Sequence, residues 1–230
     1  MFWQEDEDKS IPYEIPNDIV DISFPIQCKK LSVDHIHSLS KNIQEQLPWC
    51  KAEAGFSIHP VHVAETGNGW QRPDDSEDAY LWPSRRTKIT LRVPQHRVDD
   101  CKVLAGCCFD VAGDQLTIVS GMKVKALTNA SVIFARQVVS SNEEDENSFL
   151  ERMHEAIFDL TEVRVRKMIC GLSHKIITPE KTVVTKHLMV ADLESIPSIK
   201  IQQMGLGGSG LLGCGIFLPH KGIKSLHTTE

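Results

Sequence analysis

A glycine-rich segment near the C-terminus is the part of the chain with the clearest potential for chemistry. Six of the fourteen glycines lie within eleven positions there: Gly205, Gly207, Gly208, Gly210, Gly213 and Gly215. Because glycine has no side chain, such a segment lets backbone N–H groups approach a phosphate closely. We therefore expect the loop 205–215 to contact a phosphate-bearing ligand, with a flexible turn between two elements as the alternative.

The elements around these glycines argue against a nucleotide cofactor. Residues 205–210 match the dinucleotide-binding pattern G-x-G-x-x-G, which functions only where it follows a strand and opens a helix. Here the glycines follow a helix-like stretch, 195–204, and precede a strand-like one, 216–218. The P-loop pattern G-x-x-x-x-G-K-[ST] does not occur in the sequence. We expect no cofactor.

The charge distribution favours a nucleic-acid partner although the net charge is −6. Three acidic segments, 1–20, 74–78 and 143–146, hold 14 of the 31 acidic residues and only one of the 25 basic ones. The remaining chain therefore carries 24 basic against 17 acidic residues. A basic surface with separate acidic loops is compatible with RNA or DNA binding, and ordinary solubilising charge is the alternative.

A basic stripe is expected on the strand-like segment 84–93. Alternation along a strand places the polar members on one face: Arg86, Lys88, Thr90 and Arg92. The apolar members fall on the other face: Ile89, Leu91 and Val93. A solvated sheet face usually mixes both signs of charge, and this face has no acid within the segment. The pattern therefore indicates contact with phosphates.

Composition limits the class of protein. The chain has 230 residues, enough for one large domain or two small ones. No run of about 18 apolar residues occurs, and the acidic start is unlike a signal peptide. The seven cysteines form no C-x-x-C pair, so neither a disulfide framework nor a zinc ribbon is indicated. We expect a cytoplasmic protein with no membrane partner and no metal site.

Hydrophobic periodicity predicts two copies of one order of elements. In the first half, strands are expected around 20–28, 56–63, 84–93, 107–111 and 116–119, with helices over 33–47 and 98–104. In the second half, strands are expected around 132–139, 163–169, 183–190 and 216–218, with helices over 149–160 and 195–204. Each half reads approximately as β-α-β-β-α-β, which is typical of a ferredoxin-like module.

The predicted fold class is therefore α+β, with tandem ferredoxin-like (RRM-like) modules, βαββαβ repeated. The expected division is an acidic N-terminal tail over 1–17, an N-terminal module over 18–128 and a C-terminal module over 131–224. The C-terminal module contains the glycine-rich loop.

Short motifs spread over residues 21–224 carry a resemblance to a known family. They include Asp34-His35, Leu47-Pro-Trp49, Ile58-His-Pro60, Ser84-Arg-Arg-Thr-Lys88, Leu193-Glu-Ser195, Gly205-x-Gly207 and Gly213-Cys-Gly-Ile-Phe-Leu-Pro-His-Lys221. Each is weak by itself. In combination the chain resembles the CRISPR-associated endoribonucleases of the RAMP superfamily, which cut repeat RNA into guide units, and within them the Myxococcus-type branch.

The resemblance implies metal-independent cleavage of repeat RNA. In that reaction a 2′-hydroxyl attacks the adjacent phosphate and leaves a 2′,3′-cyclic phosphate and a 5′-hydroxyl, and the enzyme stays bound to the guide RNA in an effector complex with other CRISPR subunits. The reaction needs a general base, a general acid and positive charge or N–H donors at the phosphate.

His35 is the expected general acid or base, since the family commonly carries a histidine in or just after this helix. Near a helix N-terminus the macrodipole disfavours the imidazolium, so the ring should be neutral and able to accept a proton. A capping or solvated histidine is the alternative. His37 lies about 200° further around a regular helix and is a reserve, as is His59. Relatives often add a tyrosine, whereas the two tyrosines here, Tyr13 and Tyr80, lie outside that helix.

The expected RNA-binding residues are Arg85, Arg86, Lys88, Arg92, Gly205, Gly207, Gly208, Gly210 and Lys221. Trp70 and Trp82 could stack on bases, although burial is the commoner fate of tryptophan. Two other functions remain open at this point. One is a RAMP-type subunit that binds RNA without cutting it, and the other is a protein of the same fold that binds no nucleic acid.

Overall fold

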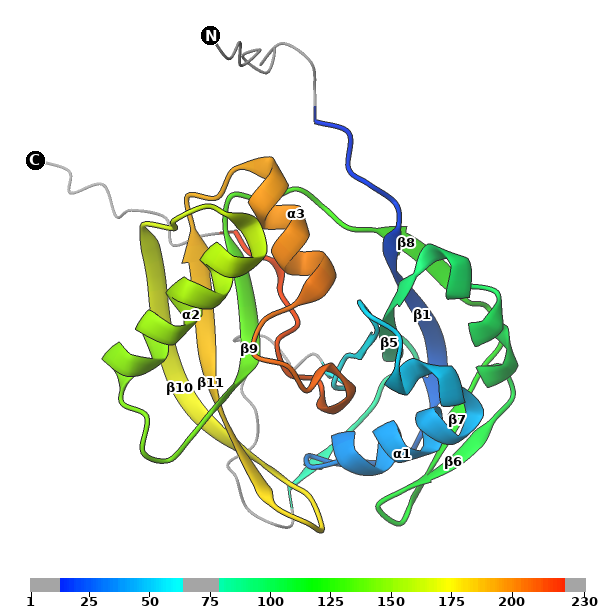
Figure 1. Ribbon diagram of the computed structural model, residues 1–230. Helices are drawn as coiled ribbons and strands as arrows, with labels where there is room; N and C mark the ends of the chain where they lie inside the picture. Colours follow the sequence, from blue (N-terminus) through cyan, green and yellow to red (C-terminus); the bar gives the residue numbers. More distant parts are fainter. Residues whose placement is uncertain (1–12, 64–78, 222–230) are drawn as a thin grey trace, which may run out of the picture.

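A computed structural model describes residues 13–63 and 79–221 of the chain. Two antiparallel sheets lie side by side, and the helices cover one side of them (Figure 1). Several parts of the sequence discussed above lie outside the described ranges. They are the first twelve residues of the predicted tail, Trp70, the acidic segment 74–78 and the residues after 221. The order of elements confirms the predicted α+β fold with tandem ferredoxin-like modules, while the boundary near residues 128–131 stays a prediction.

The first sheet contains six strands. They are β1 (Ile19–Gln27), β3 (Ser57–Ile58), β5 (Lys88–Pro94), β6 (Cys108–Val111), β7 (Asp114–Ile118) and β8 (Lys123–Ala126). β1 lies between β5 and β8, and β3 pairs with the outer edge of β5. This is the strand order of a ferredoxin-like module. β7 pairs with the end of β1 and forms a hairpin with β6.

Short elements complete the N-terminal module. They are β2 (Leu31–Ser32), α1 (Ile36–Gln46), β4 (Tyr80–Leu81) and the 3₁₀ helices η1 (Pro48–Lys51), η2 (Gln95–Arg97) and η3 (Asp100–Leu104). The second helix of this module was expected over 98–104 and is present as 3₁₀ turns. Its two buried residues, Cys101 and Leu104, are three positions apart, a spacing that suits a 3₁₀ helix.

The second sheet has four strands in the order β10-β11-β9-β12. The elements of this module are β9 (Ile133–Ser140), α2 (Glu146–Thr161), β10 (Lys167–Ile177), β11 (Thr182–Ala191), α3 (Ser195–Met204), η4 (Gly210–Leu212) and β12 (Leu218–Pro219). Asp145 caps α2 by accepting a 2.7 Å hydrogen bond from the Ser148 N–H at Oδ1. The sheet therefore repeats the ferredoxin-like order of the first module.

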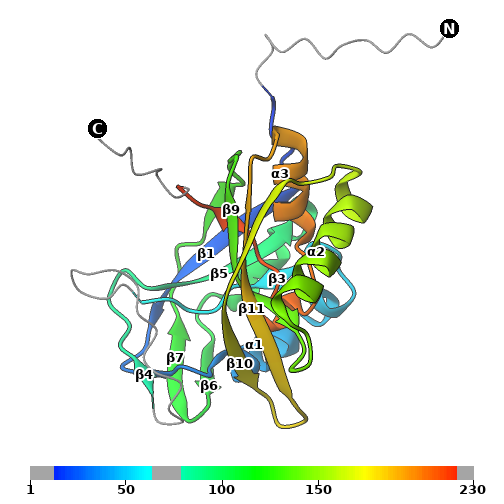
Figure 2. The ribbon, with the colours of Figure 1, turned by 90° about the vertical axis from the view of Figure 1, so that its left-hand side faces the viewer.

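The two longer helices, α1 and α2, each bury an apolar stripe. α1 places Ile36, Leu39 and Ile43 against the first sheet, and α2 places Phe149, Met153 and Ile157 against the second. The tip of the β10-β11 hairpin reaches the first module, where Ile176 and Val183 join its core. Seen from the side, the helices lie on one face of the sheets, and none of the helices within residues 13–63 and 79–221 lies over the opposite face (Figure 2).

Candidate functional site

The glycine-rich loop lies between the two modules. A Cβ on Gly213 would lie 2.6 Å from Pro60 Cγ, and one on Gly210 would lie 3.0 Å from Ser57 Cβ. The Gly215 N–H donates to Gln137 O at 2.6 Å, which joins the end of the loop to β9. Gly210 and Gly213 need to be glycine because the two modules approach closely at these positions, so part of the predicted phosphate loop has a packing role.

The tip of the loop is its accessible part. Gly207, Gly208 and Ser209 are exposed to solvent, and a Cβ on Gly208 would meet no atom within 4 Å. Gly205 and Gly210 are half-buried. Of the four glycines expected to donate N–H groups to RNA, Gly207 and Gly208 are therefore the best placed to do so.

Arg92 is buried, and the prediction that it belongs to an exposed basic stripe is wrong. Its side chain is 1% exposed, and Nε lies 2.8 Å from Asp21 Oδ1. Nη1 donates to two carbonyl oxygens of the second module, Gln202 O at 2.5 Å and Phe217 O at 3.1 Å. Alternation does place Arg92 on the face opposite Leu91, but the end of α3 and residue 217 cover that part of the face. Arg92 therefore joins the two modules.

Asp21 and His59 share this buried site. Burial acts to raise the pKa of Asp21, but hydrogen bonding and the charges of His59 and Arg92 hold it well below its usual range. Burial lowers the pKa of His59, against the opposing effect of Asp21. His59 Nε2 is 3.6 Å from Asp21 Oδ1. The group is an ion pair within the first module, between neighbouring strands β1 and β5, with a buried histidine beside it, and its arginine also reaches the second module.

The other predicted basic residues are exposed. Arg85 and Arg86 lie in a turn closed by a 3.0 Å hydrogen bond from Thr87 N to Ser84 O, so the expectation of Arg86 on the strand is wrong. Lys88 begins β5 and pairs with Pro25. The same face of the sheet carries Lys123 and Lys125 of β8, which pair with Ser23 and Asp21. A basic face exists, but β8 supplies much of it.

A broad open cavity adjoins Arg85. Its volume is about 1020 Å³, and its lining includes Lys29, Lys30 and Arg85. Lys30 Nζ lies 3.9 Å from the centroid of the Tyr80 ring. Asp114 also lines the cavity and lies 3.8 Å from Lys30 Nζ, so Lys29 and Arg85 supply the net positive charge on this side of the first module. Lys221, at the end of β12, is also exposed.

His35 is held between two backbone segments. Its side chain is 2% exposed, Nδ1 lies 2.8 Å from Ser32 O, and Nε2 accepts from the Val61 N–H at 2.8 Å. Since a backbone carbonyl accepts and an N–H donates, the ring is neutral with its proton on Nδ1. Both nitrogens are thus used to fix the start of α1. His37, two residues further along the chain, is half-buried.

The helix-free face of the second sheet holds a group of rings that the sequence did not reveal. Phe134 of β9 lies 5.4 Å from His187 and 5.7 Å from His220, measured between ring centroids. His187 lies 4.8 Å from His174. Burial, His174 and Arg136 lower the pKa of His187 to about 4. A cavity of about 140 Å³ beside Phe134 and Arg136 reaches the first module at His59 and His62.

A family model described as Cas6 Crispr matches residues 20–222, which span both modules and the glycine-rich loop. The chain belongs to the Cas6 family. A curated Cas6 relative from Myxococcus xanthus (strain DK1622), named a CRISPR-associated endonuclease, is 26% identical over 201 residues, covering 87% of this chain and 81% of the relative. The resemblance inferred from the motifs is confirmed.

Solved structures show the Cas6 fold independently of sequence identity. A RAMP protein described as binding different RNA substrates matches with a TM-score of 0.60 at 9% identity, covering 86% of this chain and 98% of its own. A Cas6-related protein from Pyrococcus furiosus matches with a TM-score of 0.59 at 10% identity, covering 89% and 100% of the two chains. Identities this low show the fold and carry no residue roles.

Within 13–63 and 79–221, no group of three or more histidine, cysteine or acidic side chains is arranged to hold a metal ion. No helix in those ranges is long and apolar enough to span a bilayer.

Proposed function

We propose that this Cas6 family member is an endoribonuclease that cuts CRISPR repeat RNA by transesterification without a metal ion. The observation that carries the proposal is the family match over residues 20–222, supported by the relative named as a CRISPR-associated endonuclease. The 2′-hydroxyl attacks phosphorus, the bond to the 5′-oxygen breaks, and a proton moves to that oxygen. The products are a 2′,3′-cyclic phosphate and a 5′-hydroxyl.

His37 is the proposed group for proton transfer. His35 already uses both ring nitrogens, so accepting a substrate proton would break its contact with Val61 N–H or Ser32 O. His37 lies in the first turn of α1, about 200° around the helix from His35, and is half-buried. The buried His35 then serves to position the start of α1, and His37 acts from it.

The exposed basic residues and the loop tip are proposed to bind the RNA backbone. Arg85, Arg86, Lys88 and Lys221 supply positive charge, and Gly207 and Gly208 supply N–H donors. Gly205 and Gly210 shape the loop. The protein stays bound to its product in the prokaryotic cytoplasm and joins other CRISPR effector subunits through that complex.

A second function is supported by the burial of His35. If His37 does not transfer protons either, the chain is a RAMP-type subunit that binds guide RNA without cutting it. Both functions need the basic face and the loop tip, so RNA binding alone does not separate them.

The test incubates the purified protein with the host's repeat RNA in EDTA and identifies both product ends. Wild type is expected to leave a cyclic phosphate and a 5′-hydroxyl, and His37→Ala is expected to lose activity. The matched control is His154→Ala, which removes a half-buried histidine from α2. Binding without cleavage by wild type would establish the non-catalytic subunit, and cleavage that stops in EDTA would refute the metal-independent reaction.

A further inference from the structure

A row of three exposed lysines follows β1 on the face of the first sheet that none of the described helices covers. Lys125 and Lys123 of β8 pair with Asp21 and Ser23 of β1, and Lys88 of β5 pairs with the same strand further along. Residues that pair across strands share a face of the sheet, so the three amino groups gather on one side. These three residues form the lysine row.

The lysine row is not neutralised by the described residues. No carboxylate in the described part of the chain lies within 4 Å of any of the three amino groups. Asp21, which pairs with Lys125, is bound by Arg92 at 2.8 Å. Charges of one sign gathered on a surface raise the local concentration of the opposite sign, so the row favours an anionic occupant.

The chain enters the first module beside the lysine row. Tyr13 and Ile15 pack against a small apolar cluster formed by Ile19, Leu127 and Ile199. Leu127 directly follows β8, the strand that carries two of the three lysines. Residue 13 is therefore held at the end of that strand.

The acidic segment 5–8, with the sequence Glu-Asp-Glu-Asp, is close enough along the chain to reach the row. Lys125 and Lys123 are two and four residues from Leu127, about 7 Å and 13 Å along an extended strand. The segment ends five residues before Tyr13 and begins eight residues before it, which corresponds to about 17 Å and 27 Å of extended chain. Each of its carboxylates can therefore reach the row from the point where residue 13 is held.

We propose that the acidic segment 5–8 binds the lysine row within the same molecule and competes with RNA for it. Four consecutive carboxylates offer the row the repeated negative charge that a phosphate backbone offers. RNA that contacts only the row must displace the segment, whereas repeat RNA also gains contacts at the loop tip. The segment thus selects against RNA held by charge alone. The inference rests on the proposed function in naming RNA as the competitor.

The first measurement needs no RNA. A carbodiimide joins a carboxylate directly to an amino group in contact with it, and mass spectrometry of the digested protein identifies the joined residues. Cross-links from segment 5–8 to the lysine row within one molecule are expected, and they should disappear in 1 M NaCl, where the Debye length is about 3 Å. Absence of these cross-links at low salt, or their presence only in covalent dimers, would overturn the proposal.

The second measurement compares RNA binding by wild type and by a neutralised variant, Glu5→Gln/Asp6→Asn/Glu7→Gln/Asp8→Asn. The probe is a fluorescein-labelled 2′-O-methyl oligouridylate, which cannot undergo 2′-hydroxyl attack, and Kd is measured by fluorescence anisotropy in about 50 mM NaCl. Each surface ion pair contributes a factor of roughly 1.4 to 5, so releasing three lysines should tighten Kd at least about threefold. The difference should shrink as salt is added.

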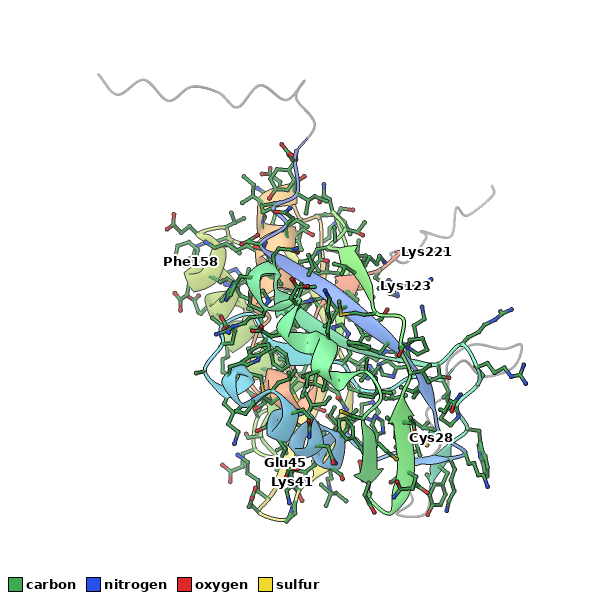
Figure 3. All side chains as sticks on the ribbon, turned by 90° about the vertical axis from the view of Figure 1, so that its right-hand side faces the viewer. Cys28, Lys41, Glu45, Lys123, Phe158 and Lys221 are labelled. Carbon is green, nitrogen blue, oxygen red and sulfur yellow. The ribbon has the colours of Figure 1, made fainter. Side chains whose placement is uncertain are left out.

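The matched control removes four acidic charges elsewhere, in Glu143→Gln/Glu151→Gln/Asp159→Asn/Glu162→Gln. These residues are exposed and lie on or next to α2, and Figure 3 shows Phe158 of α2 on the side of the molecule opposite Lys123. The control has the same net charge as the neutralised variant and is expected to bind the probe like wild type. The proposal is overturned by equal tightening in both variants, by no tightening in the neutralised variant, or by no binding of the probe to any of the three proteins.

Failure of the proposed nuclease would be a separate result, because repeat RNA cleavage by the same proteins is measured in parallel. Cross-links to the lysine row together with tighter binding by the neutralised variant, but without cleavage, refute the nuclease alone. Cleavage by a wild type that shows no such cross-links refutes the competition alone. Thermal melting of the two variants confirms that the comparison is between folded proteins.

Discussion

Replacing His35 by alanine tests whether this histidine is structural. The substitution removes two contacts that fix the start of α1, from Nδ1 to Ser32 O and from the Val61 N–H to Nε2. It leaves the Val61 N–H buried, because Val61 is 2% exposed, and a small cavity replaces the imidazole. The segment around Val61 and the helix start then lose the group that holds them together.

The expected cost follows from these two contacts. A buried donor or acceptor left without a partner costs about 1–3 kcal/mol. Two such groups together would cost about 2–6 kcal/mol. Ser32 is only half-buried and its carbonyl can regain a water, so we expect a total near the low end of that sum, about 3 kcal/mol. For a chain of 230 residues, each kcal/mol lowers Tm by about 2–4 °C. His35→Ala should therefore melt about 6–12 °C below wild type.

The assay compares wild type, His35→Ala and His37→Ala by thermal melting and by cleavage of repeat RNA well below each Tm. We expect His35→Ala to lose stability and retain cleavage at low temperature. His37→Ala should melt close to wild type and lose cleavage. The reasoning is refuted if His35→Ala melts within about 2 °C of wild type and yet fails to cleave, because His35 would then take part in the chemistry.

Three further predictions concern the contacts between modules and the acid response. Arg92→Leu leaves the Asp21 carboxylate buried without its cation and should lower the free energy of unfolding in urea by about 3–5 kcal/mol, whereas a change in the exposed Lys88 should shift it by less than about 0.5 kcal/mol. Gly213→Ala should lower Tm more than Gly208→Ala. The backbone angle φ is positive at both positions, 74° and 72°, but only at Gly213 would the added Cβ lie against Pro60. Equal losses of Tm would contradict the packing role of the loop. The pKa of Glu144 is lowered to about 2, first by hydrogen bonds from Arg152. The stability that the ionised Glu144 contributes is present above the unfolded pKa of about 4.5 and is lost as the pH falls towards 2. Glu144→Gln should therefore flatten the decline of Tm in that range.

Periodicity predicted the repeated order of helices and strands in the two modules and the buried faces of α1 and α2. It missed β8 (Lys123–Ala126), and it placed a strand over 163–169 where β10 runs over Lys167–Ile177. The stripe of α2 was visible because residues three and four apart share a helix face, a local property of the chain. The segment 56–63 shows the limit of this reasoning, because only Ser57–Ile58 pairs as a strand. Pro60 has no N–H to donate to a sheet, and the N–H of Val61 bonds to His35.

The sequence by itself determined two things. It determined which side chains share a face of a helix or strand, and its motifs carry the family resemblance. The tertiary structure alone decided which faces are covered. Arg92 became a buried link because Gln202 and Phe217, more than 100 residues away, supply carbonyl oxygens to its guanidinium. Phe134 gained ring neighbours from strands distant in sequence. Such contacts depend on how two modules pack, and no local pattern of residues encodes that packing.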